Sequence, residues 1–124
     1  MTFIDFQSII CRILSEHGIA DGRIFVADEP LHLSGLPVVT VAMTTQSGNT
    51  NEGFWEAMVT VCCSDSDEYA ALRLAHDVRG VLDGFGGYGI ADIAHASTIP
   101  VRTYETAPVT HTYALTFRVL YQEF

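Results

Sequence analysis

The histidine and acidic side chains of this sequence are the first places to look for chemistry. It has five histidines and fifteen acidic residues, but no zinc-type spacing such as H-E-x-x-H or C-x-x-C. Asp92, His95 and Ser97 are close in sequence and could be imagined as a triad. Strand positions 92 and 95, however, point to opposite faces, and no nucleophile elbow surrounds Ser97. We therefore predict no catalytic residues, no metal site and no cofactor.

A glycine-rich segment, Gly84-Phe85-Gly86-Gly87-Tyr88-Gly89, matches the dinucleotide fingerprint G-x-G-x-x-G in its letters. That fingerprint follows a strand and opens a helix, so that the helix N-terminus meets the phosphates. Here the segment follows a predicted helix and leads toward a predicted strand. It is therefore interpreted as the exit of a helix.

Composition excludes several classes of function. The chain has 15 acidic and 6 basic residues, all of the latter arginine, and a net charge of -9. A protein that grips nucleic acid needs a basic patch to displace counterions, so this balance argues against that role.

Three cysteines cannot form a paired framework and are typical of reduced thiols. No apolar run approaches the ~20 residues that span a bilayer, and the N-terminus lacks the positive region of a signal peptide. We expect a protein made inside the cell, with no membrane partner.

The elements that must position any site are organised around Glu56–Gly89. Alternating apolar residues predict a strand over Glu56–Cys63. The polar run Ser64–Glu68 then predicts a helix start, with Asp65 and Glu68 at capping-box spacing. The helix has an apolar stripe at steps of three and four, and Gly84 is predicted to end it. Such a helix must pack on its own sheet.

The remaining elements follow from the same periodicities. They are a helix over 2–17, strands over 23–27, 36–45, 90–101 and 112–122, a polar loop Gln46–Gly53 and a connection Arg102–Thr110. The order α-β-β-β-α-β-β in 124 residues predicts one α+β domain. We expect a two-layer sandwich whose mainly antiparallel sheet, of four or five strands, is covered by two helices. Its other face, with Met58, Cys62, threonines and alanines, is predicted to meet another subunit.

The order and residue types of these segments resemble the tail-terminator (tail-completion, head–tail joining) proteins of long-tailed bacteriophages over nearly the whole chain. The resemblance rests on an N-terminal helix and five segments, namely Arg23-Ile24-Phe25, Leu36-Pro37-Val38-Val39-Thr40-Val41, Val59-Thr60-Val61-Cys62-Cys63 running into Asp67-Glu68-Tyr69-Ala70-Ala71-Leu72-Arg73, Val78-Arg79-Gly80-Val81-Leu82-Asp83-Gly84, and Tyr113-Ala114-Leu115-Thr116-Phe117-Arg118-Val119.

This resemblance implies a non-enzymatic virion protein of the tail or neck that assembles as a hexameric ring. The ring would cap the tail tube, end its polymerisation and dock the head connector (stopper) protein. DNA would pass through the lumen without sequence-specific binding. An acidic ring would repel the DNA backbone and avoid gripping it.

Candidate interface residues are those of the loop, the connection and three arginines. They are Gln46, Ser47, Gly48, Asn49, Thr50, Asn51, Glu52, Arg73, Arg79, Arg102, Tyr104, Glu105 and Arg118. The arginines are expected either to pair with acids of a neighbouring subunit or to be solvated surface charges. Two other classes remain open: another neck or tail-tube component, and a small intracellular α+β enzyme or ligand-binding domain that uses His76 or His95.

Overall fold

Two α-helices and five strands make up the part of the chain that the computed structural model describes, residues 6–26, 37–47, 54–87, 89–101 and 111–122. In chain order they are α1 (Phe6–Glu16), a 3-10 helix η1 (Ile19–Gly22), β1 (Ile24–Val26), β2 (Val38–Ser47), β3 (Phe54–Asp65), α2 (Glu68–Leu82), β4 (Ile90–Val101) and β5 (His111–Gln122). The sheet order is β1-β2-β3-β5-β4, and only β1 and β2 pair in parallel. The predicted α+β class and element order are confirmed.

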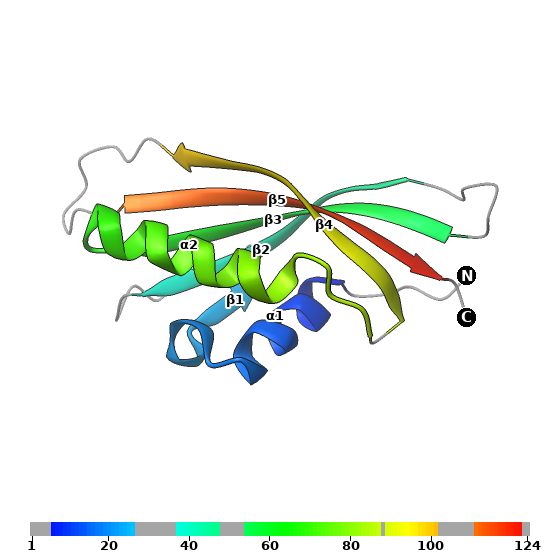
Figure 1. The fold of residues 1–124 in the computed structure, drawn as a ribbon, viewed down its shortest axis with the longest axis horizontal. Coiled ribbons are helices and arrows are strands. Elements are labelled where there is room, and N and C mark those ends of the chain that lie inside the picture. The colour runs from blue at the N-terminus through cyan, green and yellow to red at the C-terminus, as the bar shows by residue number, and fades with distance from the viewer. Residues whose placement is uncertain (1–5, 27–36, 48–53, 88, 102–110, 123–124) are drawn as a thin grey trace.

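Both helices lie on one side of the sheet, which we call the helix face (Figure 1). α1 packs on β1 and β2, and α2 packs on β3 and β5. The alternation predicted for the last strand is confirmed, because its odd-numbered apolar residues enter this core. The largest fully buried side chains are Ile10, Ile13, Leu14, Val39, Val41, Val59, Val61, Leu82, Ile93, Leu115 and Phe117. Each contributes about 1.5–3 kcal/mol by leaving water.

The helix α2 begins two residues later than the sequence pattern indicated. Its N-cap is Asp67, whose side chain accepts a hydrogen bond from the backbone N–H of Ala70 at 3.3 Å. Asp65 instead ends β3, because Thr112 and His111 of β5 still pair with the last two residues of that strand. The capping box predicted from Asp65 and Glu68 is therefore wrong. The predicted end is confirmed, since Gly84 has φ 81°, a conformation that favours glycine.

The loop predicted over Gln46–Gly53 begins later than expected. Gln46 and Ser47 belong to β2, where they pair with Ala57 and Glu56 of β3. The physical reason is that the backbone groups of Ala57 and Glu56 are free to pair with β2 whatever side chains β2 carries, so its polar residues continue the strand. β3 itself also starts two residues before its predicted start, at Phe54. A register shift between Met43 and Thr45 accommodates the extra length. The other loop residues lie outside the described ranges.

The strand β4 does not alternate as predicted. Register shifts between Ile90 and Asp92 and between His95 and Ser97 each insert one residue. As a result Ile90 and Ile93, which strict alternation would place on opposite faces, are both buried. Hydrogen-bond partners, rather than residue types, decide where such bulges fall.

The turn after α2 covers the free edge of β4. The carboxylate of Asp83 accepts the backbone N–H of His95 at 3.1 Å. One residue further, the N–H of Gly84 donates to the carbonyl of Ile93 at 2.7 Å. These backbone groups therefore point away from β5 and are already satisfied. Farther along the same edge Pro100 has no N–H to offer.

Candidate interaction surfaces

The residues imagined as a triad do not come together. Asp92 and Ser97 pair with Leu120 and Thr116 of β5, whereas His95 pairs with Phe117. Neighbouring positions of one strand point to opposite faces, so the histidine is on the helix face and the other two are not. Its Nε2 instead lies 2.6 Å from the hydroxyl of Thr98. Its ring stands edge-to-face on Phe117, with centroids 5.6 Å apart.

Other chemistry is equally unsupported by the described residues. Among them, no three His, Cys, Asp or Glu side chains are grouped so that they could hold a metal ion. His76 is exposed on α2, and His17 caps α1 through a 2.9 Å contact between Nδ1 and the carbonyl of Ile13. Within the same ranges no helix is both long and apolar enough to cross a membrane.

The side of the sheet away from both helices, which we call the open face, has a neutral centre. At its middle lie mostly small, uncharged side chains of β2, β3 and β5, namely Thr40, Ala42, Met58, Thr60, Cys62, Ser64, Thr112, Ala114 and Thr116. Each is half-buried or buried. The hydroxyl groups of Ser64 on β3 and Thr112 on β5 are hydrogen-bonded to each other, with their oxygens 2.8 Å apart. Among the described residues of this face, the charged side chains lie toward one end, where Arg118 and Glu56 form a 2.9 Å ion pair.

The adjacent cysteines Cys62 and Cys63 lie on opposite faces of the sheet. Cys63 is fully buried on the helix face, and Cys62 is half-buried on the open face. Burial raises the pKa of the Cys63 thiol far above its ordinary value, and the neighbouring Cys62 raises it further. Burial also raises the pKa of Cys62, partly offset by a hydrogen bond with Thr40. Both thiols are neutral at pH 7.

The raised pKa of Cys63 predicts a loss of stability in alkali. An unfolded thiol ionises near pH 9.0, whereas the folded protein keeps the proton at higher pH. Ionisation therefore stabilises only the unfolded state. We expect no effect of Cys63 below pH ~8 and, above pH ~9, a fall in the free energy of unfolding approaching ~1.4 kcal/mol per pH unit. Urea unfolding at pH 7, 8, 9, 10 and 10.5 measures this slope. Cys63→Ala should flatten it, and equal slopes in both proteins would contradict the assignment.

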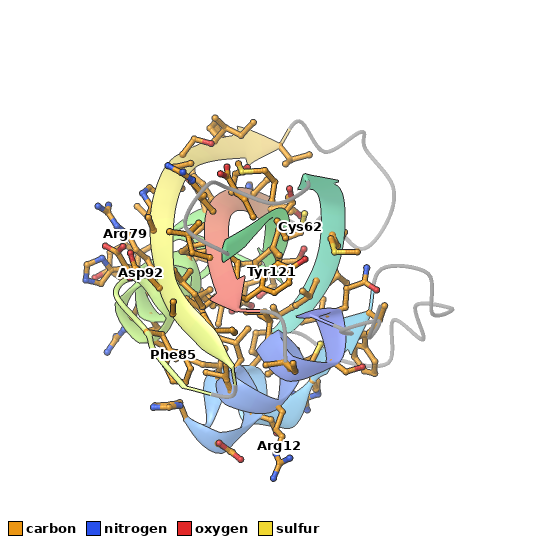
Figure 2. The ribbon with its side chains drawn as sticks, turned by 90° about the vertical axis from the view of Figure 1, so that its right-hand side faces the viewer. Arg12, Cys62, Arg79, Phe85, Asp92 and Tyr121 are labelled. Atoms are coloured by element: carbon orange, nitrogen blue, oxygen red, sulfur yellow. The ribbon has the colours of Figure 1, made fainter. Side chains whose placement is uncertain are left out.

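The three arginines predicted at interfaces differ in their surroundings. Arg118 is held by Glu56 within the chain. Arg73 and Arg79 are exposed on α2, and neither forms an ion pair with any residue that the structure describes. Figure 2 shows Arg79 at the periphery of the molecule, directed away from the sheet, while Tyr121 lies toward the interior. The other predicted residues, Gly48–Glu52, Arg102, Tyr104 and Glu105, lie outside the described ranges.

A groove between α2 and β4 was not predicted from the sequence. It is lined by Leu72, Ala75, His76 and Arg79 of the helix and Thr98 of the strand. Of the lining residues, Leu72 is 47% exposed, and Tyr69, one turn earlier on α2, is 71% exposed, which is unusual for such large apolar side chains on a helix that also has a buried stripe. Tyr69, Leu72, His76 and Arg79 follow one another at steps of three and four. That second stripe was visible in the sequence and could have indicated the groove.

Comparison with known proteins identifies the fold. No family model matches the chain, and no curated protein matches it either. Among solved structures, the chain is similar to a chain of the "Virion of native gene transfer agent (GTA) particle", at 17% sequence identity and a TM-score of 0.52. The likeness covers 90% of this chain and 84% of that chain. At this identity the likeness establishes a shared fold.

Proposed function

We propose that this protein is a structural component of a phage-like virion, and specifically the subunit of a ring that caps the tail tube. The observation that carries the proposal is the fold likeness to a virion chain over 90% of the sequence. It agrees with the resemblance of the segment order to tail-terminator proteins. In this proposal the ring ends tube polymerisation and joins the tail to the head connector.

The open face supports a role in assembly. Its centre is neutral and, apart from Met58, built of short side chains, which lose little conformational entropy when they are buried. A surface without charged groups at its centre is typical of the core of protein–protein interfaces. We propose that a copy of the chain or a neighbouring virion protein covers this face. Catalysis has no part in the proposal.

The net charge of -9 supports the proposed passage of DNA. A ring of such subunits repels the phosphate backbone, so that DNA moves through the lumen without being held. The electrostatic potential of the lumen in an assembled ring tests this point, and a basic lining would contradict it.

Two experiments on particles test the proposed function. Deleting the gene should yield heads and tails that are not joined, with tubes of irregular length in electron micrographs, and a plasmid copy should restore joined particles. A gold label on an epitope-tagged copy should lie at the junction of head and tail. Label along the tube would identify a tube component instead, and particles without label would contradict a virion role.

A further inference from the structure

The outer side of α2 combines features that its role in the core leaves unexplained. Its buried side, with Leu74, Val78 and Leu82, packs on the sheet. On the opposite side, Tyr69 and Leu72 expose apolar surface beside Arg73, His76 and Arg79. The helix dipole accounts for basic residues near the C-terminus. It does not account for two exposed large apolar residues or for the groove that Leu72 lines.

The charge at this groove is opposite in sign to the net charge of the chain. The whole protein carries a net charge of -9. Arg12 and Arg118 are each paired with a glutamate of their own chain. Arg79, by contrast, lines the groove and forms no ion pair within the described residues. A partly apolar groove with an unpaired arginine is complementary to an acidic surface that also offers apolar contact.

This same chain presents such a surface at the other end of α2. The turn Asp65–Glu68 places three carboxylates within four residues, next to Tyr69. Asp67 and Glu68 are exposed. Inside the chain, Asp65 accepts a hydrogen bond from the N–H of Ser66, Asp67 accepts one from the N–H of Ala70, and Glu68 accepts one from the hydroxyl of Tyr113, and all three donors are neutral. Their charge is therefore available to a cation of another molecule.

We propose that the groove of Leu72, Ala75, His76, Arg79 and Thr98 receives the acidic turn Asp65–Glu68 of a second copy of this chain. The contact joins two different surfaces of identical subunits. Such a head-to-tail contact can be repeated from copy to copy, and it ends only when the series closes on itself. Arg79 faces the incoming carboxylates, and Leu72 and Tyr69 supply the apolar part of the contact. The inference rests on the proposed function, in which copies of the chain assemble. Its test measures the contact between copies, and this measurement is separate from whether tails are joined to heads.

Covalent trapping is the direct test. Arg79 and Glu68 of one chain are 11 residues apart on one helix, about 16 Å at 1.5 Å per residue. That is too far for a disulfide, which needs Cα atoms within about 7 Å. In an Arg79→Cys/Glu68→Cys variant in which the half-buried Cys11 and Cys62 are replaced by serine, mild oxidation should therefore link different copies into a ladder of oligomers on a non-reducing gel. The single and control variants carry the same two serines. Each single variant should stop at a dimer at most. The matched control, Arg12→Cys/Glu68→Cys, should give no ladder, because Arg12 lies on α1.

Charge exchange gives a second readout on the uncrosslinked protein. Arg79→Glu should weaken self-association about tenfold in sedimentation experiments, because like charges then meet across the contact. Adding Glu68→Arg to the same chain should restore the association, since every contact regains opposite charges. Arg12→Glu should change little.

Both readouts are taken on the purified protein at high concentration and, for the cysteine variants, on assembled particles. A ladder from the test pair alone, with restoration by the charge exchange, supports the proposal. The absence of a ladder in both preparations overturns it, even if particles are joined normally and the proposed function stands. It is also overturned if Arg79→Glu abolishes binding of a tube or connector protein, or of DNA, without affecting association of copies. A ladder from protein that gold labelling places outside the particle neck would contradict only the tail-terminator role.

Discussion

Replacing Val78 with aspartate is expected to prevent the protein from folding. Val78 is fully buried where α2 lies on the sheet. An ionised carboxylate at this position would be desolvated among the apolar side chains of the core, at a cost of several kcal/mol. A domain of this size has only about 5–15 kcal/mol of stability to lose. The far-UV circular dichroism at 25 °C should show loss of the native signal and no cooperative thermal transition.

Leu72→Asp is the matched control for this substitution. It places the same carboxylate on the same helix, but at a side chain that is 47% exposed. Because the carboxylate stays hydrated at this position, the midpoint temperature of thermal unfolding should stay within a few degrees of the wild-type value. If Val78→Asp were to unfold at nearly the same temperature as Leu72→Asp, the packing of α2 on the sheet would be disproved.

Replacing Phe117 with alanine is expected to lower the free energy of unfolding by about 3–5 kcal/mol. Phe117 is 1% exposed at the centre of β5, the strand that pairs with both β3 and β4. The truncation removes buried apolar surface and leaves a cavity that the neighbouring strands cannot close. It also removes the edge-to-face contact with His95. Urea denaturation followed by fluorescence of the single tryptophan measures the change.

Ile99→Ala serves as the control for Phe117→Ala. Ile99 is 57% exposed on β4 and pairs with Ala114 of the same β5 strand. Because its side chain remains largely in water, truncation should cost well under half as much as in Phe117→Ala. Similar losses from both variants would show that β5 does not run through the core in the register described.

Periodic burial made the architecture predictable from the sequence. In β5, the buried residues Leu115, Phe117 and Val119 alternate with residues on the open face of the sheet. This pattern predicted both the strand and the face that it turns toward the core. The stripe of α2 did the same for the helix. These are local consequences of one-sided burial, which a sequence records directly.

What could not be predicted depends on partners distant in sequence. The bulges of β4 arise where its register on β5 changes, and the true N-cap of α2 is Asp67 because β3 keeps pairing as far as Asp65. The groove needs Thr98 to lie beside Arg79, a juxtaposition created only by the return of β4 along the sheet. The intrachain ion pair of Arg118 with Glu56 has the same origin.

The cap that Asp83 and Gly84 place on the outer edge of β4 bears on unwanted pairing between copies of the chain. With those amide and carbonyl groups occupied and a proline further on, a second chain cannot extend the sheet by backbone pairing along that part of β4. Any contact between copies there must be made by side chains, and their fit can change one residue at a time.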